Sequence, residues 1–255
     1  MRVGSDPVRV SPSKLEAVDR CALRWVLEAG GATAPDAQSQ SLGTLVHSIA
    51  QTFPAGTHHE LAAELDRRWP ELGLRPGWPA TSLRRRADAM IGRLAEYLKD
   101  SGEAVAVEAP FQVRLGGALL AGVVDRLERT DDGLRVADLK TGKSAPSRAE
   151  TETNPQLGAY QLALTEGAFD LPDVPDETPS AGARLVFVGM GRSAALRSQA
   201  PLQVRDDGSS WVHDMVDEVA STMSGATFGA RQNDLCSVCP VRRSCPVQVE
   251  GRQVL

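Results

Sequence analysis

The chain has 255 residues, of which 42% are hydrophobic and 24% charged, and its formal net charge is −5. This composition is ordinary for one globular domain, and the acidic balance argues against broad, nonspecific affinity for DNA. The sequence shows no signal peptide and no apolar run that could span a membrane. We therefore expect a cytoplasmic protein without a membrane partner.

The first part of the chain, residues 11–100, is expected to be mainly helical. Ser11-Pro12 marks a helix start, and the apolar stripe that follows has Cys21 at its edge. Further on, Gly43-Thr44-Leu45-Val46-His47 is expected to open a second, short helix in which Gly43 lies one turn before His47. A lone histidine is usually structural, so His47 gains interest only from the residues that accompany it.

A longer helical pattern covers residues 81–99 and places its apolar side chains on one stripe. This helix carries the basic run Arg84-Arg85-Arg86. Arginines on a helix surface usually face water. We therefore interpret the run as a solvated face rather than as a track for DNA.

Strands are expected over residues 104–114, 118–128, 134–140 and 184–189. The second and third of these strands alternate with period two and flank turn residues, which predicts a hairpin. If Asp131-Asp132 forms the tip, Asp125 lies opposite Asp138. If the tip is Asp132-Gly133, Asp125 faces Lys140 instead, and either register brings the three charged groups together.

Two carboxylates held this close repel one another unless a cation joins them, and oxygen ligands of this kind suit Mg²⁺ or Mn²⁺. The alternative is an exposed hairpin face with a cross-strand ion pair. Two features favour the metal. The first is that the chain has only four lysines, so a lysine beside Asp125 and Asp138 is not expected by chance. The second is that the flanking residues are apolar enough for a buried strand pair.

A helix is predicted to begin at Asn154-Pro155, with the asparagine as N-cap, and to run to Glu166. Gln156 and Tyr160 lie four apart on one face of this helix. A last helix near residues 211–223 leads to the C-terminal cysteines. We expect a single domain over residues 1–255, with an α/β core at 104–190 and a helix and cysteine tail at 211–250.

Three of the four cysteines form a C-x2-C-x5-C pattern at Cys236, Cys239 and Cys245, and the fourth is Cys21. Without a secretory signal, a disulfide framework is not expected. Two thiolates from one tight turn can reach a common metal. Zinc and an iron–sulfur cluster both accept four thiolates, and the spacing does not decide between them.

The motif order GxxxH, GxxD, DxK and QxxxY resembles the PD-(D/E)xK nuclease superfamily in its RecB-like branch, the nuclease domains of AddB, AdnA and AdnB helicase–nucleases included. The motifs are Gly43–His47, Gly122–Asp125, Asp138–Lys140 and Gln156–Tyr160. The resemblance implies a restriction-endonuclease-like mixed β-sheet flanked by helices. It also implies that His47, Asp125, Asp138 and the backbone carbonyl of Leu139 bind Mg²⁺ or Mn²⁺. Lys140 would orient the attacking water, and Gln156 and Tyr160 would position the lysine and the scissile phosphate.

The cysteines resemble those of the iron-staple nucleases within the same branch. This resemblance implies a [4Fe–4S] cluster held by Cys21, Cys236, Cys239 and Cys245, with Zn²⁺ as the second choice. Such a cluster would tie an N-terminal helix to the C-terminal tail, a structural role that could also help to grip DNA.

The expected activity is a metal-dependent deoxyribonuclease that acts, in exonuclease fashion, on single-stranded DNA during break repair and recombination. Gly142-Lys143-Ser144 is not part of a P-loop, because position 137 is alanine where that motif needs glycine. A helicase motor must then belong to a longer parent chain or to a partner. The alternatives are a stand-alone RecB-family exonuclease and a non-catalytic iron–sulfur scaffold that binds DNA ends.

Overall fold

The computed structural model of the protein describes residues 6–32, 37–175 and 177–254. The described residues fall into two compact units. Unit 1 lies within Met1–Pro35, Gln112–Gly122 and Gln203–Leu255, and unit 2 within Asp36–Phe111 and Val123–Leu202. This division does not test the prediction that residues 1–255 form a single domain, which stays a prediction.

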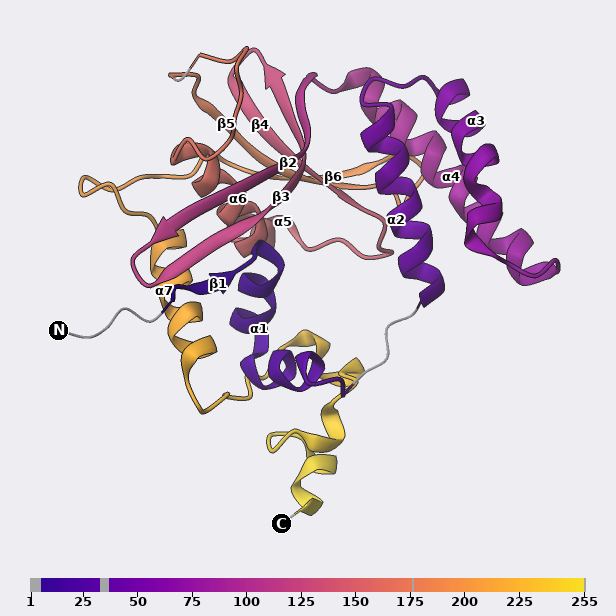
Figure 1. The fold of residues 1–255 in the computed structure, drawn as a ribbon. Coiled ribbons are helices and arrows are strands. Elements are labelled where there is room, and N and C mark those ends of the chain that lie inside the picture. Colours follow the sequence, from indigo (N-terminus) through magenta and orange to yellow (C-terminus); the bar gives the residue numbers. More distant parts are fainter. Residues whose placement is uncertain (1–5, 33–36, 176, 255) are drawn as a thin grey trace. The chain divides into compact units, whose positions relative to one another are not determined.

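Unit 2 contains most of the regular structure (Figure 1). Its helices are α2 (Ala37–Thr52), α3 (His58–Arg68), the 3-10 turn η1 (Trp69–Leu72), α4 (Trp78–Asp100), α5 (Arg148–Glu152) and α6 (Pro155–Thr165). Its strands are β4 (Gly133–Lys140), β5 (Ser180–Phe187), β6 (Ala195–Gln199) and parts of β2 (Glu103–Leu115) and β3 (Ala118–Thr130), which both continue into unit 1.

The strands of unit 2 form a mixed sheet. β3 pairs with β4 in antiparallel fashion, β4 with β5 in parallel, and β5 with β6 in antiparallel fashion. The β3–β4 pairing runs from Thr130↔Gly133 to Arg126↔Ala137, so the hairpin tip is Asp131-Asp132. The first of the two predicted registers is therefore the one that forms, and the expected mixed α/β fold is confirmed.

Helices pack against both faces of β4 and β5. On one face, α2, α3 and α4 form a group beside the sheet and share one apolar core with it (Figure 1). The strands contribute Ala137, Leu139, Val186 and Val188 to this core. α6 packs on β5 and β4 and is buried around its whole circumference. Because side chains alternate along a strand, Asp138 and Lys140 point away from the core that holds Ala137 and Leu139.

A buried carboxylate braces the β3–β4 hairpin. Glu128 is fully buried, and its oxygens accept hydrogen bonds from Arg126 at 3.0 Å, from Arg135 at 3.2 Å and from the hydroxyl of Tyr97 on α4. A buried charge is tolerated only when it is paired in this way. The network joins both strands of the hairpin to α4 inside unit 2.

Unit 1 contains β1 (Val8–Val10), α1 (Pro12–Ala29), α7 (Trp211–Ser224) and the 3-10 turns η2 (Asp234–Val238), η3 (Arg242–Ser244) and η4 (Val249–Val254). Ser11 caps α1 as predicted, accepting a hydrogen bond from the backbone N–H of Lys14 at 3.3 Å. α7 packs against α1 and β1. None of the described helices in either unit is long and apolar enough to cross a bilayer.

Most predicted elements form. The strand predicted over residues 184–189 is observed as β5, from Ser180 to Phe187, and the short helix α5 was not predicted. β1 and β6 were not predicted, since three- and five-residue strands give little periodicity to detect. The expectation that Gly43–His47 opens a short helix is wrong, because this segment lies inside the 16-residue α2. Gly43 serves packing rather than a helix start: a Cβ there would lie 2.9 Å from Oγ1 of Thr141.

Candidate active site

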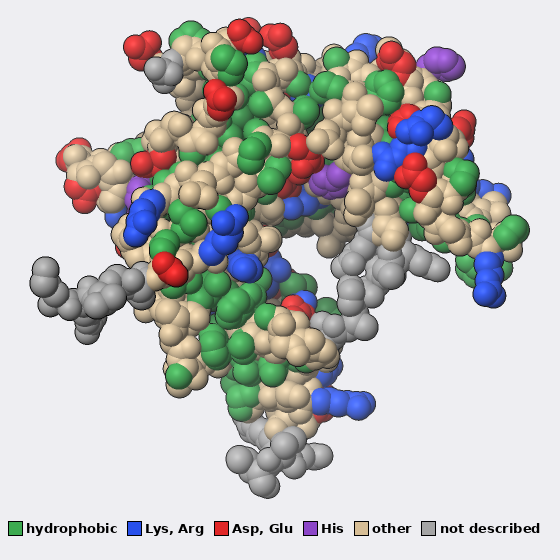
Figure 2. All heavy atoms as spheres, in the orientation of Figure 1, with side chains coloured by type: hydrophobic (Ala, Val, Ile, Leu, Met, Phe, Trp, Pro, Cys, Tyr) green, Lys and Arg blue, Asp and Glu red, His purple; other side chains and the backbone are tan. Residues whose placement is uncertain are grey.

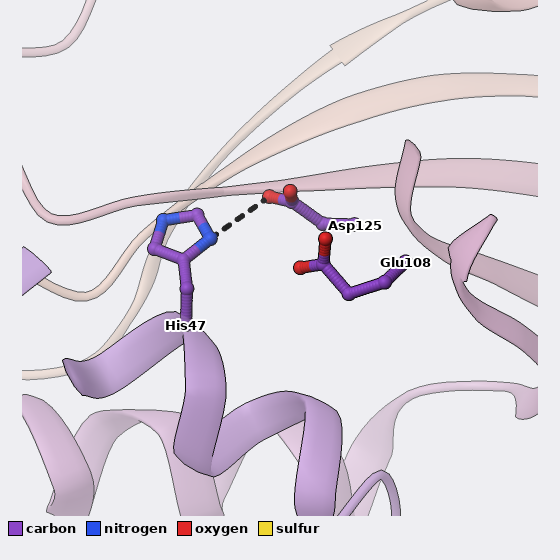
Figure 3. Close-up of side chains that lie close together, drawn as sticks. All are labelled: His47, Glu108 and Asp125. Carbon is purple, nitrogen blue, oxygen red and sulfur yellow. Dashed lines mark ion pairs between the residues drawn. The ribbon is translucent and has the colours of Figure 1, made fainter. Parts of the chain in front are cut away.

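Three side chains of unit 2 converge as a group of possible metal ligands. His47 comes from α2, Glu108 from β2 and Asp125 from β3, and Figure 3 shows them pointing toward one another. One ligand atom of each lies within 4.8 Å of those of the other two. Nδ1 of His47 is 3.5 Å from Oδ2 of Asp125. The structure thus brings the predicted His47 and Asp125 together and adds a carboxylate that the sequence analysis did not identify.

Glu108 reaches this group through an unusual backbone conformation. Among the described residues it is the only non-glycine residue with a positive φ, at 47°. A left-handed conformation costs a non-glycine residue roughly 1–2 kcal/mol, and such strain gathers at functional sites. One sequence feature could have indicated Glu108: it is the only charged residue between Glu103 and Arg114, in an otherwise apolar strand.

A second cluster of predicted residues forms a continuous hydrogen-bond network. Nζ of Lys140 lies 2.7 Å from Oδ2 of Asp138 and donates to Oε1 of Gln156 at 2.7 Å. The amide nitrogen of Gln156 donates to Oδ1 of Asp138 at 3.1 Å and to the hydroxyl oxygen of Tyr160 at 2.9 Å. Burial and the charge of Asp138 raise the pKa of Tyr160, so its hydroxyl stays neutral. Gln156 therefore orients the lysine and the carboxylate together.

Asp125 connects the two clusters. Asp125 and Asp138 are the next residues on their strands after the last β3–β4 pair, and Oδ2 of Asp125 accepts a hydrogen bond from the backbone N–H of Leu139 at 2.7 Å. Asp138 does not belong to the group within 4.8 Å. Its predicted role as a ligand, and that of the Leu139 carbonyl, stay predictions.

The carboxylates shift one another's protonation. Burial disfavours the charged form of His47, but neighbouring carboxylates, above all Asp125, outweigh this effect and raise its pKa. Burial and the charge of Asp125 raise the pKa of Glu108. The pKa of Asp138 is raised to about 6, mainly by burial. The charge of Asp125 raises it further, whereas the ammonium of Lys140 lowers it. Without a cation the site therefore holds protons readily, and a bound divalent cation would favour the charged carboxylates instead.

The donor atoms of this site suit a divalent cation. Two carboxylates and an imidazole converge, and oxygen-rich sets of this kind are the ones that Mg²⁺ and Mn²⁺ prefer. Oδ2 of Asp138 is buried, and its partner is the ammonium of Lys140 at 2.7 Å. That oxygen keeps lone pairs that a cation could use.

The three ligands open onto a cavity of about 770 Å³ in unit 2. Figure 2 shows acidic and histidine side chains meeting in a recess beside α2. The cavity is lined by Gly43, Thr44, His47, Ser48, Gln51, Arg86, Glu108, Asp125, Thr141 and Gly142. It is large enough for a nucleotide-sized group.

The four cysteines gather separately, in unit 1. They are free thiols and line one cavity, Cys21 and Cys245 being buried and the other two half-buried. No three of their sulfurs lie within 4.8 Å of one another among the described residues. The backbone N–H of Asn233 donates to Sγ of Cys236 at 3.3 Å.

Cys21 sits at a break in α1. Its φ of −168° and ψ of 103° are extended rather than helical. In an unbroken helix the N–H of Leu23 would donate to the carbonyl of Asp19. Here Leu23 donates to the carbonyl of Gly229 at 3.0 Å, and the carbonyl of Asp19 accepts from Arg231 at 2.7 Å. The C-terminal segment therefore takes up the backbone groups that the break at Cys21 releases.

Comparison with known proteins is consistent with this geometry. Residues 9–246 match the model of the PD-(D/E)XK nuclease superfamily. The Gene 69 protein of Mycobacterium phage L5 is 29% identical over 143 residues, which cover 56% of this chain and 44% of the phage protein. The Gene 69 protein of Mycobacterium phage D29 is 29% identical over 150 residues, which cover 56% of this chain and 48% of the phage protein. The chain thus spans about half the length of these curated relatives. The crystal structure of a protein named SSO0001 aligns over 96% of this chain and 89% of its own, with a TM-score of 0.45 and 16% identity.

Replacing Glu108 should weaken metal binding without weakening the fold. In the wild-type protein, Mn²⁺ should raise the melting temperature, since a ligand at a hundred times its Kd stabilises by about 2.7 kcal/mol. Glu108→Gln should lose most of this rise and keep a metal-free melting temperature at or above that of wild type, because repulsion with Asp125 is relieved. The exposed Glu103 on the same strand supplies the control, Glu103→Gln. An equal Mn²⁺ shift in all three proteins would remove Glu108 from the site.

Proposed function

The chain belongs to the PD-(D/E)XK nuclease superfamily, whose members are nucleases that use divalent metals, and from this membership we propose that it hydrolyses phosphodiester bonds of DNA with Mg²⁺ or Mn²⁺. The observation that carries the proposal is the convergence of His47, Glu108 and Asp125 beside the Asp138–Lys140 pair. Superfamily membership alone would also fit a chain that has lost its acids. A non-catalytic scaffold is disfavoured because these residues are intact.

Each residue has a distinct task in the proposed reaction. His47, Glu108, Asp125 and Asp138 would hold the metal, which would supply charge stabilisation and lower the pKa of the attacking water. The ammonium of Lys140 stabilises the negative charge that develops on the phosphate. Gln156 fixes that ammonium through its carbonyl oxygen and fixes Asp138 through its amide. Tyr160 in turn holds the amide of Gln156.

We further propose single-stranded DNA as the substrate, degraded in exonuclease fashion, with a helicase motor in the same parent chain or in a partner. The order of the four motifs, which resembles that of helicase–nucleases of the RecB-like branch, supports this proposal. A motor would expose the single strand that the cavity beside His47 receives. Double-strand-break repair and recombination are the processes in which such a pair of activities would work.

For unit 1 we propose a [4Fe–4S] cluster held by Cys21, Cys236, Cys239 and Cys245, with Zn²⁺ as the competing occupant. Two observations support it: the four thiols line one cavity, and the helix break at Cys21 is stabilised by hydrogen bonds from the C-terminal segment. A cluster would join α1 covalently to the tail and add stability to contacts that the chain already makes.

The nuclease proposal is tested with end-labelled single-stranded DNA in Mg²⁺, Mn²⁺ and EDTA. Wild-type protein should cleave only with metal. Asp138→Asn should abolish cleavage and leave the melting temperature near that of wild type, because it removes a buried charge and keeps an atom of similar size beside Gln156. The control Asp132→Asn changes an exposed acid at the hairpin tip and should cleave normally. Wild-type rates in Asp138→Asn would refute the active-site assignment.

Lys140→Ala should slow the chemical step and spare metal binding. Its ammonium acts on charge that exists mainly in the transition state, so kcat should fall by about a hundredfold or more with little change in KM. Titration calorimetry with Mn²⁺ should give an affinity within about threefold of wild type. Loss of Mn²⁺ binding would show instead that Lys140 is needed to keep the acids in place.

Anaerobically purified wild-type protein should be brown and contain about four irons per chain. Cys245→Ala should lose most of the iron and melt at a lower temperature, whereas Ser237→Ala, an exposed change inside the same cysteine segment, should keep both. Asp138→Asn should also stay brown, because its side chain belongs to unit 2. A colourless protein with one zinc per chain would overturn the iron–sulfur proposal and leave the nuclease proposal untouched.

A further inference from the structure

The three consecutive arginines of α4 have three different environments. Arg84 forms ion pairs with Asp66 and Asp88, and its guanidinium lies 5.3 Å from the ring centre of Trp69. Arg85 is exposed, as the solvated-face interpretation predicts. Arg86 instead lines the cavity that holds the candidate metal ligands. From the sequence, the three arginines received one interpretation. In the structure, Arg86 differs from the other two.

Arg86 has hydrogen-bonding capacity to spare. A guanidinium carries five N–H donors. Within the described residues Arg86 makes one hydrogen bond, from Nη2 to the carbonyl of Thr141 at 3.0 Å, and its Nε is buried without a partner. Among the described residues, no carboxylate oxygen lies within 4.0 Å of the guanidinium nitrogens of Arg86, so Arg86 forms no ion pair with them. Within the part of the chain that the structure describes, no ion pair neutralises its charge.

The surroundings of Arg86 define what it could bind. Among the described residues that line the cavity it is the only arginine or lysine, and it shares that lining with Glu108 and Asp125. An acidic cavity repels a nucleic-acid strand except where a metal or a fixed cation meets a phosphate. Gly142 on the same lining carries no side chain, and no atom lies within 4 Å of the place that a Cβ would take there, which leaves room for a strand to approach.

We propose that Arg86 binds a backbone phosphate of the DNA strand in this cavity, next to the phosphate that is cleaved. Arginine suits this task because its planar fork can donate two parallel hydrogen bonds to phosphate oxygens. The contact carries no sequence information and fixes the register of the strand against the metal ligands. This inference rests on the proposed nuclease function and adds a residue to its substrate site.

The competing explanation is that Arg86 only ties α4 to the segment that follows Lys140. Arg93 provides the comparison, because it lies two turns further along α4 and also bonds to backbone carbonyls at the sheet. Its Nε donates to the carbonyl of Val188 at 2.6 Å and its Nη1 to that of Gly191 at 3.0 Å. Arg93 does not line the cavity. It is thus a tether without access to the proposed phosphate.

The test measures binding of a fluorescein-labelled single-stranded oligonucleotide by anisotropy, in Mn²⁺ and over a series of KCl concentrations. All proteins carry Asp138→Asn so that the probe stays intact. Arg86→Gln, whose amide can still donate to Thr141, should make the slope of log Kd against log KCl shallower by about 0.7, the loss of one phosphate contact on a single strand. Arg86→Lys should keep most of the slope, and Arg93→Gln should keep all of it.

An unchanged slope in Arg86→Gln would overturn the proposal and leave Arg86 as a tether, whether or not the melting temperature falls. If Arg86→Gln does not fold, Arg86→Met takes its place: a slope shallower by about 0.7 supports the phosphate contact, and a slope within error of that of the parent refutes it. Cleavage by the protein with Asp138 intact is measured in parallel. If the protein with Asp138 intact shows no metal-dependent cleavage, the nuclease function itself is refuted. This result is distinct from an unchanged salt dependence, which refutes only the phosphate contact of Arg86.

Discussion

Two carboxylates, Asp125 and Asp138, come next to each other where β3 and β4 stop pairing, and burial makes their repulsion costly. The rest of the site can be understood as a response to this constraint. On one side the backbone N–H of Leu139 and the ring of His47 approach Asp125. On the other, Lys140 pairs with Asp138. The pKa of Asp138 is still raised, chiefly by burial and further by the charge of Asp125, and a divalent cation between the acids would favour their charged forms.

The segment after Lys140 shows how the helical layer is fitted to this sheet edge. The Oγ1 atom of Thr141 approaches α2 so closely that a Cβ at position 43 would lie 2.9 Å from it, and the carbonyl of Thr141 accepts a hydrogen bond from Arg86 on α4. Two helices are thereby held against the residue that follows the lysine. The same arrangement places His47, one turn beyond Gly43, beside Asp125. The glycine of the GxxxH pattern therefore allows close packing against Thr141, and the histidine belongs to the site.

Local rules predicted the parts of the site that depend on neighbouring residues. Strand alternation placed Asp138 and Lys140 on one face, and the Asn154 cap fixed the helix that carries Gln156. Features that depend on distant residues were missed. Glu108 joins the ligands through a left-handed backbone, which no periodicity indicates, and the break at Cys21 is stabilised by residues near the other end of the sequence. Likewise, propensity alone could not place Gly43 inside a long helix, because its partner is Thr141.

The geometry of the site predicts that one divalent cation binds among His47, Glu108 and Asp125, close to Asp138. Crystals soaked in Mn²⁺ would test it directly, with anomalous diffraction recorded above the manganese edge. We expect a single strong manganese peak about 2.0–2.3 Å from a nitrogen of His47 and from carboxylate oxygens of Glu108 and Asp125. A fully soaked crystal with no peak at this position, or with manganese bound only by other acidic residues, would contradict it.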